Sequence, residues 1–217
     1  MSMCGDVLRQ LLRFGWAAVV LSMVCGPVSA ICPTDSAGPA PGPDLRLIFT
    51  GVERGMLSTT SRINRAGVAR RASVIERLDG EDVLLLGNGS YLPPDDRHEI
   101  ARRTFIEAYR LMGYDVMNVG PSDGFDRIER PPAIVSANVV FGGEARYPPY
   151  IIRRLQLSGA ERRIAIVGLT APEATAQFRA FNGSVVIGPP DDALHALKSQ
   201  LVAEADYVVL LFAGDSS

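Results

Sequence analysis

Oxygen-bearing side chains recur at the points where the apolar segments of this 217-residue sequence end. Carboxylate, amide and hydroxyl oxygens suit a weakly held Ca²⁺ or Mg²⁺ ion, because both are hard cations that prefer oxygen ligands. The candidate ligands are Glu53, Asn88, Ser90, Asp123, Asp126 and Asn138. The two histidines, His98 and His195, lie instead in segments with a helical pattern, so we expect both to be surface residues rather than metal ligands.

Arg54 favours a different chemistry at the same place. Its guanidinium is permanently positive, so it would repel a divalent cation and could attract a phosphate or an acidic side chain. Backbone N–H groups of GNGS (87–90) and GPSDG (120–124) could help to hold such an anion. The residues of this anion or partner pocket would be Arg54, Asn88, Ser90, Asp123 and Asn138. The simpler interpretation, which we favour, is a surface ion pair of Arg54 with Glu53 or Asp123.

Alternating apolar runs and helical patterns indicate the elements that position these residues. Helices are predicted at 66–78, 98–112 and 191–204, with a short one after Pro172. Strands are predicted at 45–50, 82–86, 115–119, 133–140, 150–157, 162–169, 184–188 and 206–212. Parallel β-α-β units with one added hairpin predict an α/β sandwich with mixed sheets.

Two of the helices carry stripes that predict their buried faces. The stripe of the first helix is Val68, Ala72, Ile75 and Leu78. The stripe of the second helix is Ile100, Thr104, Ala108 and Leu111. Residues three or four positions apart share one side of a helix, so we expect both stripes to pack against a sheet.

Residues 1–30 differ in composition from the rest of the chain. Arg9 and Arg13 precede an uncharged run at 14–25, and small residues follow up to Ala30. This order is typical of a signal peptide with cleavage after Ala30, and the run is shorter than the ~20 residues of a membrane-spanning helix. We therefore expect a chain that is exported to the periplasm or secreted.

Residues 31–44 are rich in Pro, Gly and Ala and are predicted to form a linker, so the folded domain should span residues 45–217. Cys25 and Cys32 flank the cleavage point, but neither follows the small residue that usually precedes a lipidated cysteine. We therefore expect no lipid anchor. Cys32 would be the only cysteine after cleavage, and we interpret it as incidental rather than as a reactive or intermolecular thiol.

The composition is that of an ordinary single globular domain. Hydrophobic residues make up 47% of the chain, which is enough to bury a core. The 22 basic and 24 acidic residues leave a net charge of −2, and no stripe of Lys or Arg alternates with aromatic residues. We therefore do not expect nucleic acid to be a partner.

A series of sequence blocks occurs in a fixed order between residues 45 and 214. They are LIFTGVERG, GVARRASVIERL, VLLLGNGS, FIEAYRLMGYDVMNVGPSD, IVSANV, PYIIRRLQL, RIAIVGLTAPE and DYVVLLFAG. In this order they resemble the 5′-nucleotidase and UDP-sugar hydrolase branch of the calcineurin-like metallophosphoesterases. The resemblance implies a metallophosphoesterase-like four-layer α/β/β/α sandwich, with two metal ions at the carboxyl ends of the strands.

The same resemblance implies that the metal ligands have been replaced. In that family an Asp-x-His motif, a Gly-Asp block, a Gly-Asn-His-Glu/Asp loop and a later His supply ligands that generate a metal-bound hydroxide. The matching positions here are Val52 and Arg54, Gly87 and Ser90, Pro121 and Ser122, and Ala213. Asp123 keeps the acid of the third motif. A Gly-His-x-His block would lie beyond Ser217, so we expect the fold to be incomplete at its C-terminal end.

These observations lead to one favoured function and two alternatives. We expect an exported, catalytically inactive metallophosphoesterase-like domain that binds an envelope protein or an anionic ligand, without a cofactor and with self-association through exposed apolar surface. The first alternative is an active phosphoesterase or 5′-nucleotidase with atypical ligands and a weakly bound Mn, Mg, Ca or Zn ion. The second is a truncated product without a function of its own.

Overall fold

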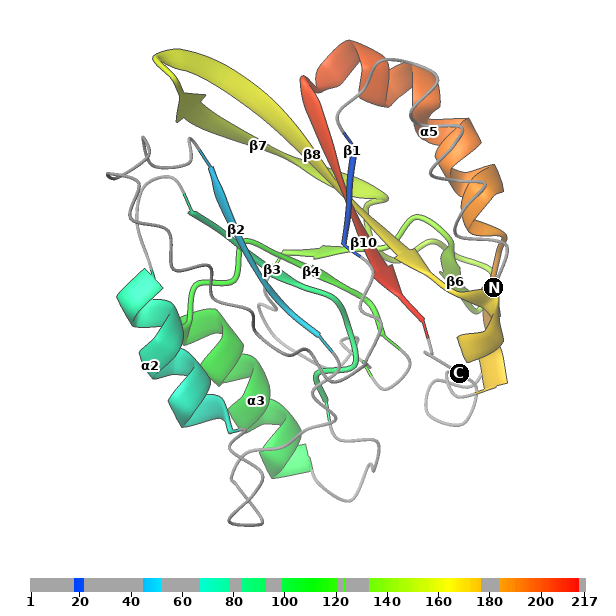
Figure 1. The fold of residues 1–217 in the computed structure, drawn as a ribbon. Coiled ribbons are helices and arrows are strands. Elements are labelled where there is room, and N and C mark those ends of the chain that lie inside the picture. Colours follow the sequence, from blue (N-terminus) through cyan, green and yellow to red (C-terminus); the bar gives the residue numbers. More distant parts are fainter. Residues whose placement is uncertain are drawn as a thin grey trace, which may run out of the picture.

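The computed structural model describes residues 18–21, 45–51, 67–78, 83–92, 99–120, 123, 133–176 and 184–214. Three α-helices lie in this part of the chain: α2 (Val68–Leu78), α3 (Glu99–Leu111) and α5 (Pro190–Glu204). A short 3-10 helix, η3, spans Pro172–Ala174, where a short helix after Pro172 is predicted. Figure 1 shows these helices on the two outer sides of a pair of sheets.

The first sheet contains four parallel strands in the order β2-β3-β4-β5. The strands are β2 (Arg46–Thr50), β3 (Val83–Gly87), β4 (Val116–Asn118) and β5 (Ile134–Val135). Helices α2 and α3 lie together on one side of this sheet (Figure 1). Because all four strands run in the same direction, the loops that follow them open at one edge.

The second sheet has the order β1-β10-β8-β7. Its strands are β1 (Ala18–Leu21), β7 (Tyr150–Leu157), β8 (Ala160–Thr170) and β10 (Tyr207–Ala213). The predicted hairpin is confirmed, since β7 and β8 pair antiparallel across Ser158 and Gly159, while β8 and β10 pair parallel. A separate antiparallel pair is formed by β6 (Val139–Phe141) and β9 (Val185–Ile187).

Buried side chains fall into three clusters that correspond to the three interfaces of a four-layer sandwich. Alternate residues of β3 point to opposite faces: Leu84 and Leu86 join the cluster between the two sheets, whereas Leu85 joins the cluster beneath α2 and α3. The third cluster joins the second sheet to α5, with Leu201 of the helix among its members. The four-layer α/β/β/α architecture with mixed sheets is therefore confirmed.

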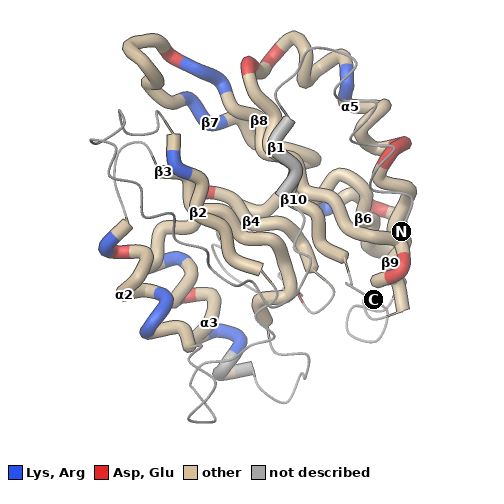
Figure 2. The backbone as a smooth tube through the Cα atoms, viewed as in Figure 1, with Lys and Arg blue, Asp and Glu red and all other residues tan. Residues whose placement is uncertain are grey.

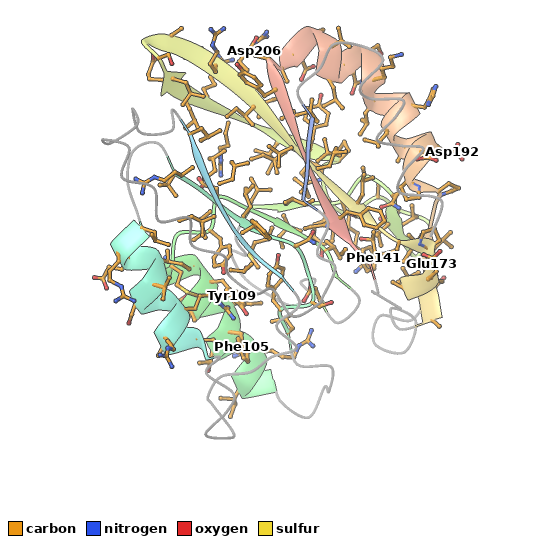
Figure 3. The ribbon with its side chains drawn as sticks, viewed as in Figure 1. Phe105, Tyr109, Phe141, Glu173, Asp192 and Asp206 are labelled. Carbon is orange, nitrogen blue, oxygen red and sulfur yellow. The ribbon has the colours of Figure 1, made fainter. Side chains whose placement is uncertain are left out.

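The buried face predicted for α3 is wrong. Ile100 and Leu111 are 83% and 71% exposed, while Phe105 and Tyr109 are fully buried; Figure 3 labels these two rings on α3. The true stripe is displaced by one position from the predicted one, because the two aromatic rings bury more apolar area than Thr104 and Ala108 can. On α2, by contrast, Ile75 of the predicted stripe is buried and only its last member, Leu78, is 39% exposed.

The single strand predicted at 133–140 is divided into two. Its first part forms β5 in the first sheet, and its second part begins β6 in the small sheet. Between them the N–H of Ser136 donates to the Pro148 carbonyl and the N–H of Ala137 donates to the Gly168 carbonyl. Hydrogen bonds to two other segments thus turn the chain out of the first sheet, and a local apolar pattern does not encode them.

Strand β1 lies inside the segment predicted to be a signal peptide. Ala18–Leu21 pairs in parallel with Val208–Leu211 along the outer edge of β10, as Figure 1 shows. Cleavage after Ala30 stays a prediction, and the predicted linker at 31–44 lies outside the described residues. No helix in the described part of the chain is long and apolar enough to cross a bilayer.

Candidate functional site

The carboxyl ends of β3 and β4 in the first sheet lie next to those of β8 and β10 in the second sheet. Asn88 follows β3, and its Nδ2 donates to the Phe212 carbonyl of β10 at 2.7 Å. Asn118 ends β4, and its Nδ2 donates to the carbonyls of Leu169 at 2.7 Å and Leu211 at 3.2 Å. Two asparagine side chains therefore fasten the end of the first sheet to the strand ends of the second.

A third asparagine extends this connection. The Asn138 Nδ2 donates to the carbonyls of Thr170 and Gly188, and the N–H of Thr170 donates back to Asn138 Oδ1 at 2.9 Å. The Thr170 hydroxyl donates to the Val119 carbonyl. Because Asn118, Asn138 and Thr170 are all buried, these polar groups satisfy one another inside the protein instead of facing a solvent-filled site.

Asp123 occupies the centre of the loops that follow β3 and β4. Its Oδ2 accepts hydrogen bonds from the N–H groups of Ser90 at 2.6 Å and Gly120 at 2.8 Å. Its Oδ1 accepts from the N–H groups of Tyr91 at 2.8 Å and Leu92 at 3.1 Å. The residue is 0% exposed, so one buried carboxylate holds both loops together.

Burial and hydrogen bonding shift the pKa of the Asp123 carboxyl group in opposite directions. Burial raises the pKa of Asp123 to about 7, although the N–H groups of Leu92, Gly120, Ser90 and Tyr91 each lower it. The four donors are neutral backbone groups rather than cations, so they offset only part of the cost of burying a charge. The stability of the two loops thus depends on whether Asp123 is ionised.

The two loops approach each other so closely that glycine is required. A Cβ atom on Gly120 would overlap the backbone nitrogen of Ser90, and a Cβ on Gly89 would lie 2.8 Å from the Gly120 Cα. Gly89 and Ser90 also have positive φ values of 94° and 59°, which a glycine accepts readily and a serine does not. Tyr91 completes the turn, since its hydroxyl accepts from the Gly89 N–H at 2.6 Å.

The sequence-predicted residues that the structure describes are partly brought together. Asn88, Ser90 and Asp123 lie at adjoining loops, whereas Asn138 bridges to Thr170 and Gly188. Gly87 and Ala213 are the last residues of β3 and β10. The remaining predicted positions lie outside the described residues: Val52, Glu53, Arg54, His98, Pro121, Ser122 and Asp126.

The structure bears on two predictions that involve Asp123. The residue is fully buried rather than at the surface, and both its oxygens accept backbone N–H groups, while its predicted partner Arg54 lies outside the described residues. The N–H groups of Ser90 and Gly120, predicted to be available to an external anion, already donate to Asp123. The physical reason is proximity, since a tethered carboxylate reaches them without the entropic cost of binding a free anion.

Several oxygens of the described candidate ligands are already hydrogen-bonded. Both oxygens of Asp123 and the Oδ1 of Asn138 accept N–H groups, and among the described candidates only the Asn88 Oδ1 is buried without a hydrogen-bond partner. A Ca²⁺ or Mg²⁺ ion needs about six oxygen ligands. Within the described ranges, no group of three or more His, Cys, Asp or Glu residues could hold a metal ion. His195 lies on the exposed side of α5.

Sequence reasoning missed Asn118 and Thr170. Asn118 interrupts the apolar run of β4 and Thr170 ends that of β8, and a polar residue at a buried strand end was the signal that could have identified both. Gly168 leaves room for the Asn118 side chain, because a Cβ at residue 168 would lie 2.5 Å from the Asn118 Oδ1 and from the Val135 carbonyl oxygen. The close approach of β8 to β4 therefore depends on a glycine.

Solved structures that superpose on this chain include a phosphoesterase and two nucleotidases. The calcineurin-like phosphoesterase YfkN from Bacillus subtilis superposes with a TM-score of 0.60 at 20% identity, over 77% of this chain and 61% of that chain. A 5′-nucleotidase precursor from Thermus thermophilus gives 0.57 at 23% identity, over 77% and 36%. The NAD nucleotidase of Haemophilus influenzae gives 0.55 at 15% identity, over 77% and 34%.

This likeness confirms the resemblance inferred from the sequence blocks at the level of the fold. No protein-family model matches the sequence, and no curated protein is similar enough in sequence to match it. The chain also spans less than two thirds of each solved structure named above. The chain therefore has the calcineurin-like phosphoesterase fold, and what those proteins do is not carried over with it.

Proposed function

We propose that this chain is an exported, non-catalytic domain with the metallophosphoesterase fold, which serves as a binding or scaffold protein in the cell envelope. The observation that carries the proposal is the internal hydrogen bonding of the loops after β3 and β4. Asp123 accepts four backbone N–H groups from them, in the place where hydrolases of this fold would present ligands to metal ions.

The asparagine bridges support the same proposal. Paired cations in a two-metal hydrolase clamp both oxygens of the displacement and need open coordination positions. Here Asn88 and Asn118 instead donate directly to carbonyls of β8 and β10. Such hydrogen bonds stabilise the junction of the two sheets.

The charge distribution agrees with a binding role at the periphery. Figure 2 shows Lys and Arg on the outer helices α2 and α3 and on the hairpin of β7 and β8. Arg110 is 51% exposed and pairs with Glu107, and Arg154 is 66% exposed and pairs with Glu161. Exposed ion pairs of this kind contribute little to stability, so they are available to a protein partner at little cost to the fold.

An active phosphoesterase with atypical ligands is the competing proposal. An assay on 5′-nucleotides and bis-p-nitrophenyl phosphate, with Mn²⁺ added and then removed by a chelator, separates the two. We expect no turnover above that of an Asp123→Asn variant, which serves as the matched control. Turnover that requires Mn²⁺ and disappears on chelation would establish the competing proposal.

Export and partner binding require their own experiment. Fractionation of cells that express the chain should place it in the periplasm or medium with an N-terminus at residue 31, as expected for cleavage after Ala30. Affinity capture from that fraction should then recover a protein partner at constant stoichiometry. A folded chain confined to the cytoplasm would contradict export, and absence of the folded chain from every fraction would favour a product without function.

A further inference from the structure

Four backbone N–H groups converge on one point beneath the carboxyl ends of β3 and β4. Three belong to consecutive residues, Ser90, Tyr91 and Leu92, and the fourth belongs to Gly120. Their distances to the two carboxylate oxygens of Asp123 are between 2.6 and 3.1 Å. Successive N–H groups that point into one concavity form an anion-binding site, because their partial positive charges add.

The pattern of donors selects a carboxylate. Each oxygen of the bound group receives two N–H groups: Ser90 and Gly120 donate to one, and Tyr91 and Leu92 donate to the other. Two acceptor oxygens on one planar group, each with two lone-pair directions, satisfy all four donors. Bonds from N–H groups to an ionised acceptor are also stronger than those between neutral groups.

The backbone that carries the donors is fixed independently of Asp123. Gly89 donates to the Tyr91 hydroxyl, and the Asn88 N–H donates to the Thr50 carbonyl of β2. The ring of Tyr91 packs edge-to-face against Tyr109 of α3, with centroids 5.3 Å apart. These contacts hold the loop in place, so the donors should keep their positions when the carboxylate is removed.

We propose that the N–H groups of Ser90, Tyr91, Leu92 and Gly120 form a carboxylate-binding site in which Asp123 is a built-in ligand, and that small carboxylates bind there when the Asp123 side chain is absent. The tethered carboxylate excludes external anions in the intact protein. Asp123 therefore blocks its own site against free anions. This proposal does not depend on whether the chain hydrolyses phosphate esters.

Chemical rescue of an Asp123→Ala variant tests this proposal. The variant should unfold at a lower temperature than the intact protein, because four buried N–H groups lose their acceptor. At pH 8, formate should raise the unfolding midpoint by several degrees along a saturating curve, and acetate should do the same. The intact protein and an Asp192→Ala variant, altered at an exposed residue of α5, should show no such curve.

Three control solutes test whether the rescue requires the charge and the planar shape of a carboxylate. Acetamide has nearly the shape of acetate without its charge, sodium chloride at equal ionic strength controls for screening, and inorganic phosphate tests a tetrahedral anion against a planar one. We expect rescue by formate and acetate to exceed that by each of these. Equal responses to formate and chloride, or an equal response of the intact protein, would overturn the proposal.

Failure of the variant to fold would still give an answer. Asp123→Ala can be unfolded in urea and diluted at pH 8 into buffer with formate or with chloride. Recovery of the native circular dichroism spectrum in formate alone supports the proposal, because the free anion then replaces the missing acceptor. Recovery in neither buffer, or equally in both, contradicts it.

Discussion

At the scale of single residues, the chemistry of this edge depends on Asp123. A carboxylate at the end of a strand would ordinarily face solvent, and here it is 0% exposed. The sequence predicts where Asp123, Asn88 and Ser90 lie along the chain. It does not predict that Asp123 turns inward, because three of its four donors belong to a loop about thirty residues away and only the folded chain brings them together.

The pH dependence of stability follows from the pKa of Asp123. Burial raises the folded-state pKa to about 7 from an ordinary 3.8, so the folded chain binds more protons than the unfolded chain between these values. The part of the stability that depends on protonation of Asp123 is complete below pH ~4 and is lost as the pH rises to ~7, at about 1.4 kcal/mol per pH unit. The hydrogen bonds that the carboxylate accepts from the four N–H groups remain above this range. Urea unfolding of the intact protein and of Asp123→Asn should show a difference in unfolding free energy that shrinks over this range.

The opposite slope would contradict this prediction. If the difference between the two proteins grew as the pH rose from ~4 to ~7, the four N–H groups would outweigh burial and the pKa of Asp123 would lie below its ordinary value. Taking the difference between the two proteins cancels the other titrating groups, because the variant lacks only the ionisable group at position 123.

Asn118 should contribute strongly to stability, because its one side chain makes three hydrogen bonds. Replacement of Asn118 by Leu preserves volume but leaves the N–H of Val119 without its acceptor, which lies at 2.8 Å, and removes the donors to Leu169 and Leu211. We expect a loss of about 3 kcal/mol in unfolding free energy, measured in urea. The control His195→Ala on the exposed side of α5 should change it by about 0.5 kcal/mol or less. Equal effects of the two changes would show that the asparagine bridge is dispensable.

At the scale of elements, the structure confirms the order of strands and helices, and the errors have tertiary causes. Most strands differ from the prediction by one or two residues, because their apolar runs are long and continuous. The face of α3 differs from the prediction because Phe105 and Tyr109 form ring contacts with each other and Tyr109 also contacts Tyr91 of the loop after β3. Partners from distant segments decide such a choice, and periodicity within one helix cannot weigh them.

The contact of β8 with β4 and β5 gives a prediction at this scale. A Gly168→Ala change would place a Cβ 2.5 Å from the Asn118 Oδ1 and the Val135 carbonyl oxygen, so we expect the strands to separate at a cost of about 1–3 kcal/mol. The control Gly188→Ala should be nearly neutral, because its Cβ would meet only the Asn138 carbonyl oxygen at 3.8 Å. Urea midpoints of the two variants provide the measurement. A Gly168→Ala protein as stable as Gly188→Ala would contradict the close approach described for β8.

At the scale of the whole molecule, β1 covers the outer edge of β10 in the second sheet. Strand β10 is an apolar strand, YVVLLFA, whose outer edge is paired by Ala18–Leu21. An apolar strand with an unpaired edge is a template for association with another chain. The predicted removal of residues 1–30 would take that partner strand away, which connects the predicted signal peptide with the predicted self-association.

Self-association should therefore depend on β1. A chain that begins at residue 31 should sediment as concentration-dependent dimers or larger species, whereas the 217-residue chain should remain monomeric. In the full chain, Val20→Pro should have the same effect as the deletion, because proline disrupts strand pairing. Monomers in all three samples at every concentration would show that the edge of β10 needs no partner.

A non-catalytic role requires that the working protein hold no catalytic metal ions, so a direct determination of bound metal is the decisive measurement. The protein should be purified without chelators, dialysed, and analysed by inductively coupled plasma mass spectrometry for Mn, Mg, Ca and Zn. We predict substoichiometric amounts of every metal and a thermal unfolding midpoint that a chelator does not shift. Two tightly bound ions per chain, with a lower midpoint after chelation, would contradict the account.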